Sequence, residues 1–307
     1  MIITRTPMRI SFVGGATDIE NYYSQFGGEV VSCAINRYIY ITLNKRDDNK
    51  IVVCYTETES VCDVNQVKHP IVKEALKMTG ITKSIEIHII SNISTIGTGL
   101  GGSSAVAVGL LKALFPEKTN REIAEMACDL EINKMGKCIG KQDQYACAFG
   151  GLNYFKFDKK GVVTSEKYVS SHAANTFLKD KMFLVKVKNN HCRVDTGLLL
   201  DAQSKYDNTE YLNAIKSLCL PFVKALNDKD DKAIINLINQ YWKLKKQLSE
   251  YVTNEDIDQT IDYYVKKGCG AKLCGAGQNG FISVYDPSKQ CKGIPVEVTP
   301  GTTISSL

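Results

Sequence analysis

A glycine-rich segment followed directly by an apolar one most constrains what this 307-residue chain can fold into. Residues 96–105 read Ile-Gly-Thr-Gly-Leu-Gly-Gly-Ser-Ser-Ala, an apolar run follows at 106–111, and a strand-like run precedes at 84–91. A tight glycine turn can direct several backbone N–H groups inward, and a helix start adds unpaired N–H groups and the positive end of its dipole. The segment therefore predicts a strand–loop–helix anion cradle, and phosphate is the commonest cellular anion that needs one.

The cradle differs from the two commonest phosphate-binding motifs. A Walker loop places a lysine after its second glycine, whereas Gly101-Gly102-Ser103 has none. The segment matches the dinucleotide pattern Gly-x-Gly-x-x-Gly formally, but no acidic strand end follows about 20 residues later. A flexible surface loop is the remaining alternative, and the direct junction with an apolar helix argues against it.

Composition indicates a soluble globular protein with room for two domains. Hydrophobic residues make up 44% and charged residues 23% of the chain, and the formal net charge is +5. Short, scattered basic runs, such as that at 243–246, indicate a solvated basic surface and not a nucleic-acid interface. Eleven cysteines lack paired spacing, and no apolar run approaches the ~20 residues that span a bilayer. We therefore expect reduced, mostly buried thiols in a cytoplasmic protein without membrane contact.

The chain changes character near residue 175. Before it, strand and helix signals alternate; after it, long amphipathic helices dominate, and the apolar spacing at 229–250 assigns Tyr241 and Trp242 to the core. Asn120 is expected to cap its helix. Strands are expected at 8–13, 30–44, 51–55, 84–91, 152–157, 162–168, 182–188, 271–273, 281–285 and 295–298, and helices at 18–24, 70–78, 103–115, 120–135, 195–205, 211–226, 229–250 and 255–267, with one more from about 141.

Three further segments carry residues suited to chemistry. Residues 5–18 place Arg9 early in a strand and Asp18 just after a double-glycine turn. Residues 271–281 form a second glycine-rich turn between strands, and Gly-Lys-Gln-Asp-Gln-Tyr-Ala at 140–146 contains Asp143. With the cradle, and in this order, these segments resemble the motifs of the GHMP kinase superfamily, small-molecule kinases that include galactokinase, mevalonate kinase and homoserine kinase.

The resemblance covers essentially the whole chain and is strongest with the bacterial D-glycero-D-manno-heptose 7-phosphate kinases. It rests on Arg-Thr-Pro-x-Arg-Ile-Ser-Phe-x-Gly-Gly-x-Thr-Asp at 5–18, on the segment 140–146, and on Phe-Gly-Gly-Leu-Asn-Tyr-Phe at 149–155. It implies a two-domain α+β fold: a ribosomal-protein-S5-like α/β nucleotide-binding domain at 1–175, and an α/β domain with long helices at 176–307 that completes the sugar pocket. It also implies ATP and Mg²⁺, phosphorylation of heptose 7-phosphate at its anomeric hydroxyl, and a place in surface polysaccharide synthesis.

The resemblance also implies roles for individual residues. Asp143 would accept the proton of the anomeric hydroxyl, and Arg9 would stabilise charge on the transferred phosphoryl group. Glu131, which alone would read as part of a solvated helix face, would bind Mg²⁺ together with Ser103. The residues expected at the nucleotide phosphates are Gly97, Thr98, Gly99, Leu100, Gly101, Gly102, Ser103 and Ser104. Those expected at the acceptor are Asp18, Gly14, Gly15, Thr17, Arg193, Gly275 and Gly277.

Four positions leave open questions at this stage. Arg193 suits the far phosphate of a sugar phosphate, but an exposed arginine at a helix start is an equal alternative. Lys141 either supports Asp143 or caps a helix, and we favour the first. Gln278 and Asn279 stand where the family commonly has glycine. Asparagine tolerates left-handed backbone angles, whereas Gln278 is expected to narrow the space beside the phosphates.

Two other functions remain as alternatives. One is a 1-kinase for an unphosphorylated sugar of the fucose or galactose type. The other is a non-catalytic sensor of sugar and ATP on the same fold, which the altered third glycine motif keeps open. The sequence leaves a homodimer open as the oligomeric state.

Overall fold

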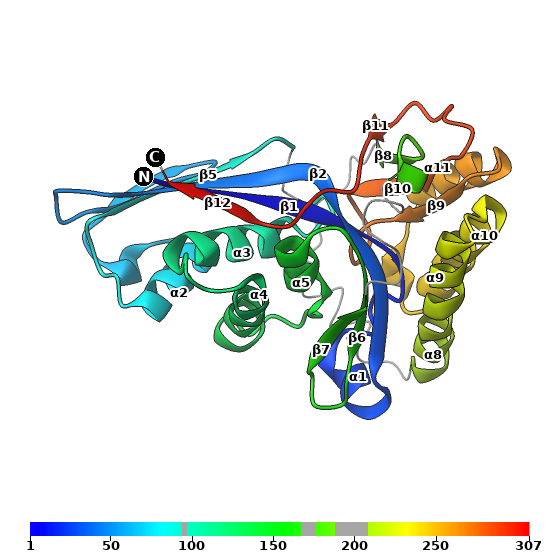
Figure 1. Cartoon of the computed structure of the whole chain (residues 1–307), viewed down its shortest axis with the longest axis horizontal. Helices are drawn as coiled ribbons and strands as arrows, with labels where there is room; N and C mark the ends of the chain where they lie inside the picture. The colour runs from blue at the N-terminus through cyan, green and yellow to red at the C-terminus, as the bar shows by residue number, and fades with distance from the viewer. Residues whose placement is uncertain (94–96, 167–175, 188–207, 307) are drawn as a thin grey trace.

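The computed structural model describes residues 1–93, 97–166, 176–187 and 208–306. These residues form two sheets, each packed against helices (Figure 1). The large sheet extends along one side of the molecule with helices α2 to α5 beneath it. The small sheet and the C-terminal helices lie at the end of the molecule away from α2, on the right in this view.

The large sheet is built mainly from the first half of the chain, in the order β12-β1-β2-β5-β3-β4, with β6 paired to β2 and β7 to β6. Neighbouring strands are antiparallel except for the parallel pair β3–β5. The pairing of β1 with β2 shifts register at Pro7/Met8, where the proline cannot donate a backbone hydrogen bond. The strands are β1 (Ile2–Val13), β2 (Gly28–Lys45), β3 (Ile51–Cys54), β4 (Thr58–Val61), β5 (Ile85–Ser91), β6 (Leu152–Phe157), β7 (Val163–Glu166) and β12 (Thr303–Ser306).

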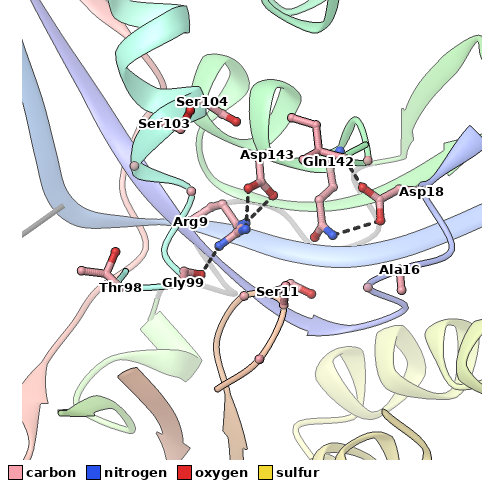
Figure 2. A pocket seen from close by; sticks show the side chains of 18 of the residues that line it. Arg9, Ser11, Ala16, Asp18, Thr98, Gly99, Ser103, Ser104, Gln142 and Asp143 are labelled. Carbon is pink, nitrogen blue, oxygen red and sulfur yellow. Dashed lines mark hydrogen bonds and ion pairs between the residues drawn. The ribbon is translucent and has the colours of Figure 1, made fainter. Parts of the chain in front are cut away.

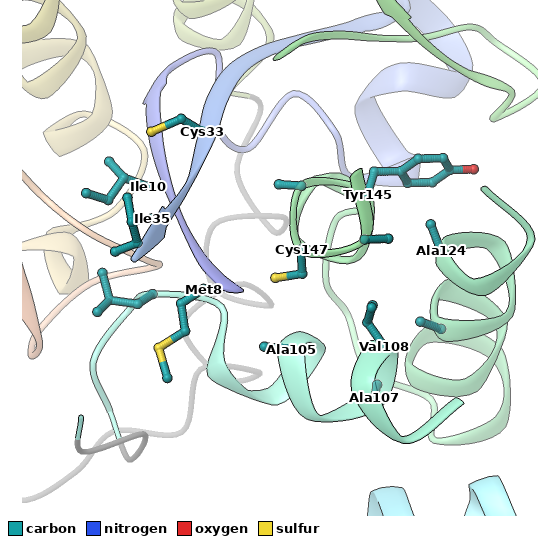
Figure 3. Packing of buried hydrophobic residues seen from close by; sticks show 14 of the residues in the cluster. Met8, Ile10, Cys33, Ile35, Ala105, Ala107, Val108, Ala124, Tyr145 and Cys147 are labelled. Carbon is teal, nitrogen blue, oxygen red and sulfur yellow. The ribbon is translucent and has the colours of Figure 1, made fainter. Parts of the chain in front are cut away.

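Small side chains let helix α3 (Gly102–Leu114) lie directly on β1. Gly109 has no room for a Cβ, which would come within 2.7 Å of Thr6 Oγ1, and Thr4 Oγ1 donates to the Gly109 carbonyl at 2.9 Å. Figure 3 shows Ala105 and Val108 of α3 facing α4 (Asn120–Cys128) and α5 (Gln142–Phe149) in the same core. Close packing of this kind fixes the start of α3, and therefore the cradle, relative to β1.

The small sheet has the order β11-β8-β10-β9, and all its pairs are antiparallel. Helix α10 (Asp231–Lys246) packs on β9 and also reaches β1, so it joins the two sheets. The remaining elements are α1 (Glu20–Phe26), η1 (Val64–Gln66), α2 (Pro70–Thr79), η2 (Asp129–Lys134), β8 (Met182–Lys186), α8 (Thr209–Ser217), α9 (Cys219–Asn227), η3 (Glu250–Val252), α11 (Glu255–Lys266), β9 (Gly270–Leu273), β10 (Phe281–Tyr285) and β11 (Ile294–Pro295).

Most predicted elements are confirmed to within six residues at each end, with the following exceptions. The predicted helix 120–135 is α4 followed by the π-helix η2, and its N-cap is Thr119, not Asn120. Thr119 Oγ1 accepts from Glu122 N while the Glu122 carboxylate accepts from Thr119 N, which is a capping box. The predicted helix 211–226 is two helices with a break at Leu218, and β4 and β12 were not predicted. The predicted helix 195–205 lies outside the described residues.

Strand β12 pairs with the outer edge of β1, so the chain returns to the large sheet after completing the small one. Isolated bridges from Val298 to Ile35 and from Pro300 to Gly150 mark its path back. The expected boundary at 175 therefore stays a prediction.

No described helix is long and apolar enough to cross a membrane. Ten cysteines are described, all as free thiols, and six of them are buried.

Candidate active site

A cleft of about 710 Å³ opens where β1, the start of α3, the start of α5 and α10 meet. Most of the predicted site residues line it, including Arg9, Asp18, Ser103, Glu131 and Asp143. Residues that lie more than a hundred positions apart in the sequence therefore meet in one place.

The glycine cradle has the backbone that its sequence predicts. Gly97, Gly99 and Gly101 have φ of +67°, +71° and +74°, and α3 begins directly after them. The cradle touches the second glycine turn: a Cβ on Gly99 would collide with the Cys274 carbonyl, and one on Gly275 would meet the Gly99 backbone. The two glycine-rich segments thus form one wall of the cleft.

Arg9 and Asp143 form a two-bonded ion pair at the centre of this wall. Arg9 Nε and NH2 donate to the two Asp143 carboxylate oxygens at 2.6 and 2.5 Å, and Arg9 NH1 donates to the Gly99 carbonyl at 2.6 Å (Figure 2). Burial works against the charge of Arg9, but the neighbouring Asp143 carboxylate more than compensates, and the pKa of Arg9 is raised. The pair fixes the carboxylate beside the cradle.

Glu131 is fully buried beneath the first turn of α3. Ser103 Oγ and Ser104 Oγ each donate to one of its carboxylate oxygens at 2.6 Å, and Gln144 Nε2 donates at 2.8 Å. Lys137 Nζ bridges Ser103 Oγ and Glu131 Oε1 at 2.8 and 2.9 Å. The π-helix η2 carries Glu131, so the local departure from α-helical geometry falls at this cluster.

Asp18 lies on the other side of Asp143, under the start of α5. Its carboxylate accepts from Gln142 N at 3.0 Å and from Gln142 Nε2 at 3.1 Å (Figure 2). Gly140 lies so close that any side chain there would collide with this carboxylate. Burial raises the pKa of Asp18 to about 6, although the Gln142 backbone hydrogen bond opposes the rise.

The raised pKa of Asp18 predicts a pH-dependent gain in stability from Asp18→Asn. The folded protein favours the protonated form, so stability is lost as the pH rises from 3.8, the ordinary value, through about 6. The difference corresponds to roughly 3 kcal/mol above pH 7. Urea unfolding should therefore show the variant to be more stable than the wild type at pH 8.

The difference in unfolding stability between Asp18→Asn and the wild type should vanish below pH 4, where Asp18 is protonated and therefore neutral, like asparagine. The new amide retains partners, because the Gln142 side chain can turn and present its Oε1, which has no hydrogen-bond partner in the described structure. A variant that is equally destabilised at pH 4 and pH 8 would contradict the assigned ionisation.

Sequence analysis missed several cleft residues, among them Tyr241, Lys245 and Lys272. Tyr241 was assigned to the core and is buried there, but it also lines the cleft; Lys245 was assigned to a solvated basic run, yet it is 5% exposed. Tyr241 and Lys245 are four residues apart on α10, and the spacing that put Tyr241 on the buried face also puts Lys245 there. Lys272 lies in β9, a strand whose residues are all buried.

Several predicted placements need correction. Gly14, Thr17 and Leu100 are not among the residues that line the cleft; the Thr17 hydroxyl instead holds the turn by donating to the Gly14 and Glu29 carbonyls. Lys141 Nζ donates to the Gly161 carbonyl at 3.0 Å and lies 5.1 Å from the centre of the Tyr23 ring, so its contacts are with these residues and not with Asp143. Arg193 lies outside the described residues.

In the second glycine turn, the left-handed residue is not the asparagine that tolerates such angles best. Gln278, not Asn279, has a positive φ, of +62°. Its N–H donates to the Val252 carbonyl and its carbonyl accepts from Asn254, while Asn279 lines the cleft. Gln278 is not among the residues that line the cleft, so the structure does not support the expected narrowing.

The known proteins that are similar to this chain include several kinases. The family model for the GHMP kinases N terminal domain matches residues 65–151. A D-glycero-alpha-D-manno-heptose 7-phosphate kinase of Campylobacter jejuni is 31% identical, over 94% of this chain and 91% of that protein. A bifunctional fucokinase/GDP-fucose pyrophosphorylase of Arabidopsis thaliana is 26% identical, over 90% of this chain and 29% of that protein. The crystal structure of a D-glycero-D-manno-heptose 1-phosphate kinase from Bacteroides thetaiotaomicron matches with a TM-score of 0.79 at 22% identity, over 100% and 99% of the two chains.

The fold and the cleft thus define a small-molecule kinase, an enzyme that transfers a phosphoryl group. The chain belongs to the GHMP kinase family. The α+β GHMP kinase fold predicted from the motifs is confirmed. The roles assigned to individual residues stay predictions.

Proposed function

We propose that this protein is an ATP-dependent sugar 1-kinase that phosphorylates D-glycero-D-manno-heptose 7-phosphate at the anomeric hydroxyl. One observation carries the proposal: the Arg9–Asp143 pair lies between the glycine cradle and the buried carboxylate of Asp18. In this proposal the phosphate donor binds on the cradle side of the Asp143 carboxylate and the polyhydroxyl acceptor binds on the Asp18 side. The 31% identity to a heptose 7-phosphate kinase supports the acceptor class.

The chemistry follows from positions along the cleft. Backbone N–H groups of residues 97–103 hold the nucleotide phosphates. Asp143 accepts the proton of the anomeric hydroxyl as that oxygen bonds to the γ-phosphorus, and the bond from the γ-phosphorus to the bridging oxygen of ADP breaks. Arg9 stabilises the charge on the transferred group. Asp18 accepts hydrogen bonds from sugar hydroxyls with its two oxygens.

The Glu131 cluster has the donor set that Mg²⁺ prefers. Two hydroxyl oxygens, of Ser103 and Ser104, converge on one buried carboxylate, and one cation, Lys137, already lies against these oxygens. Mg²⁺ commonly takes one or two protein oxygens and completes its shell with phosphate and water. Bound there, the metal would neutralise charge on the nucleotide phosphates; Ser103 and Glu131 are the proposed ligands.

The metal assignment predicts a specific defect in Glu131→Gln. We expect kcat to fall by about 10- to 100-fold and the Mg²⁺ concentration for half-maximal rate to rise, because a neutral amide is a weaker ligand. Initial rates across a Mg²⁺ titration measure both. Asp129→Asn on the same π-helix, where the side chain is 42% exposed, is the matched control and should behave as wild type. Equal Mg²⁺ dependence in both variants would contradict the assignment.

The acceptor is tested by a coupled ADP-release screen over hexoses, hexose phosphates, heptoses and heptose 7-phosphates. The proposal expects the highest kcat/KM for heptose 7-phosphate. Preference for an unphosphorylated sugar would instead indicate a fucose-type 1-kinase. The similarity to a plant fucokinase is the observation that favours this alternative. Nucleotide binding without ADP release from any sugar would indicate a sensor.

A further inference from the structure

Two lysines are buried in the acceptor half of the cleft without a carboxylate partner among the described residues. Lys245 is 5% exposed and Lys272 is 2% exposed. Lys245 Nζ donates to the Gly275 carbonyl and Lys272 Nζ donates to the Ser11 carbonyl at 2.5 Å. Each ammonium group has three donors, so one such bond leaves further donors unused.

Neighbouring contacts place this pair on the acceptor side of Arg9. Ser11 follows Arg9 by two residues on β1 and therefore shares its face of the strand. Gly15 lies where a Cβ would come within 2.8 Å of Tyr241 Oη and 3.2 Å of Ser11 Oγ, so the three residues converge. Lys272 Nζ lies 4.8 Å and Lys245 Nζ 5.9 Å from the centre of the Tyr241 ring.

The charges and polar atoms here are incompletely balanced. Arg9 is neutralised by Asp143, whereas Lys245 faces the positive charge of Lys272, which the more weakly acting Asp18 carboxylate only partly offsets. Ser11 Oγ is buried and has no hydrogen-bond partner in the described structure, and it lines the same cleft (Figure 2). Burial and the nearby Lys272 charge lower the pKa of Lys245 to about 7, and burial lowers the pKa of Lys272 to about 8. Such groups are stabilised by an arriving anion.

We infer that Lys245, Lys272 and the Ser11 hydroxyl form a binding site for a phosphate group carried by the acceptor sugar. A phosphate dianion supplies acceptor oxygens for the unused donors of both lysines, and the Ser11 hydroxyl can donate to it as well. This inference rests on the proposed function and deepens it, because it assigns selection of a phosphorylated acceptor to residues of the described cleft in place of Arg193.

The kinetic test compares Lys245→Met and Lys272→Met with Lys246→Met, which removes a neighbouring lysine that pairs with Asp258 instead. For the first two, kcat/KM for heptose 7-phosphate should fall by about 10- to 100-fold, the loss typical of hydrogen bonds to charged groups. The loss with the unphosphorylated heptose should be at least about tenfold smaller, and Lys246→Met should show neither. Equal losses with both acceptors, a rise confined to the KM for ATP, or a selective loss only in Arg193→Met would overturn the inference.

A binding test separates this inference from the proposed function. Phosphorus NMR follows inorganic phosphate titrated into wild type whose nucleotide site is saturated with a non-hydrolysable ATP analogue. Saturable binding that is lost in Lys245→Met and kept in Lys246→Met supports the site even if no heptose phosphate is turned over. No saturable binding to wild type would overturn it, even if the screen identifies a sugar kinase.

Discussion

Asp143→Asn should lower kcat by about 10² to 10⁴-fold with every acceptor, the contribution typical of a positioned general base. The amide has nearly the shape of the carboxylate and can still accept one of the two Arg9 hydrogen bonds, but it cannot take the proton of the attacking hydroxyl. The KM for ATP should change little, since the cradle does not depend on this carboxylate for its backbone angles. ADP release measured by a coupled assay gives both constants.

The variant also leaves Arg9 with an incompletely paired charge, and loss of a buried partner is destabilising. Urea unfolding and binding of an ATP analogue therefore accompany the kinetics. Loss of activity in a protein that folds and binds nucleotide supports the catalytic role. Near-normal kcat in that protein would show that Asp143 only orders the site.

Gly99→Ala should abolish or strongly weaken nucleotide binding and destabilise the fold. The backbone φ of +71° disfavours a side chain by about 1–2 kcal/mol, and the new methyl would collide with the Cys274 carbonyl. Relief requires the cradle and the second glycine turn to separate, which moves one wall of the cleft. Calorimetric titration with an ATP analogue and thermal unfolding measure the two effects.

Gly97→Ala is the matched control for this substitution. Its φ is nearly the same, +67°, but the nearest atom to a Cβ there is Asn279 Nδ2 at 3.7 Å, an ordinary contact. It should therefore show only the backbone penalty and a much smaller loss of affinity. Equal effects of the two substitutions would show that the contact between the glycine turns is unimportant.

Local sequence patterns predicted the parts of the site that depend on local geometry. The cradle needs glycines at left-handed positions, and these are visible as glycines. Arg9, Glu131 and Asp143 belong to short motifs, so the resemblance located them without knowledge of the packing. Local sequence could not show that Gln278 is the left-handed residue of the second turn, because that depends on the anchors that Val252 and Asn254 provide.

The missed features depend on tertiary contacts. Lysine is rarely buried, so composition assigned Lys245 to the surface, and only the packing of α10 against β9 and β1 shows otherwise. Strand β12 (Thr303–Ser306) has little hydrophobic alternation in its sequence. It lies at the edge of the sheet, and its extended backbone is held by hydrogen bonds to β1. The break at Leu218 between α8 and α9 has a local signal that our prediction overlooked: Pro221 has no N–H to bond the Ser217 carbonyl four residues earlier, so one continuous helix cannot form there.

Strand β12 has a consequence for synthesis on the ribosome. Among the described residues it is made last, yet it covers the edge of β1, which is made first and carries Arg9. While the chain is growing, that edge presents unpaired backbone groups that could join another nascent chain. The strand that carries Arg9 therefore acquires this neighbour only after the other strands of the large sheet have been made, and molecules stalled before residue 303 would expose an open sheet edge.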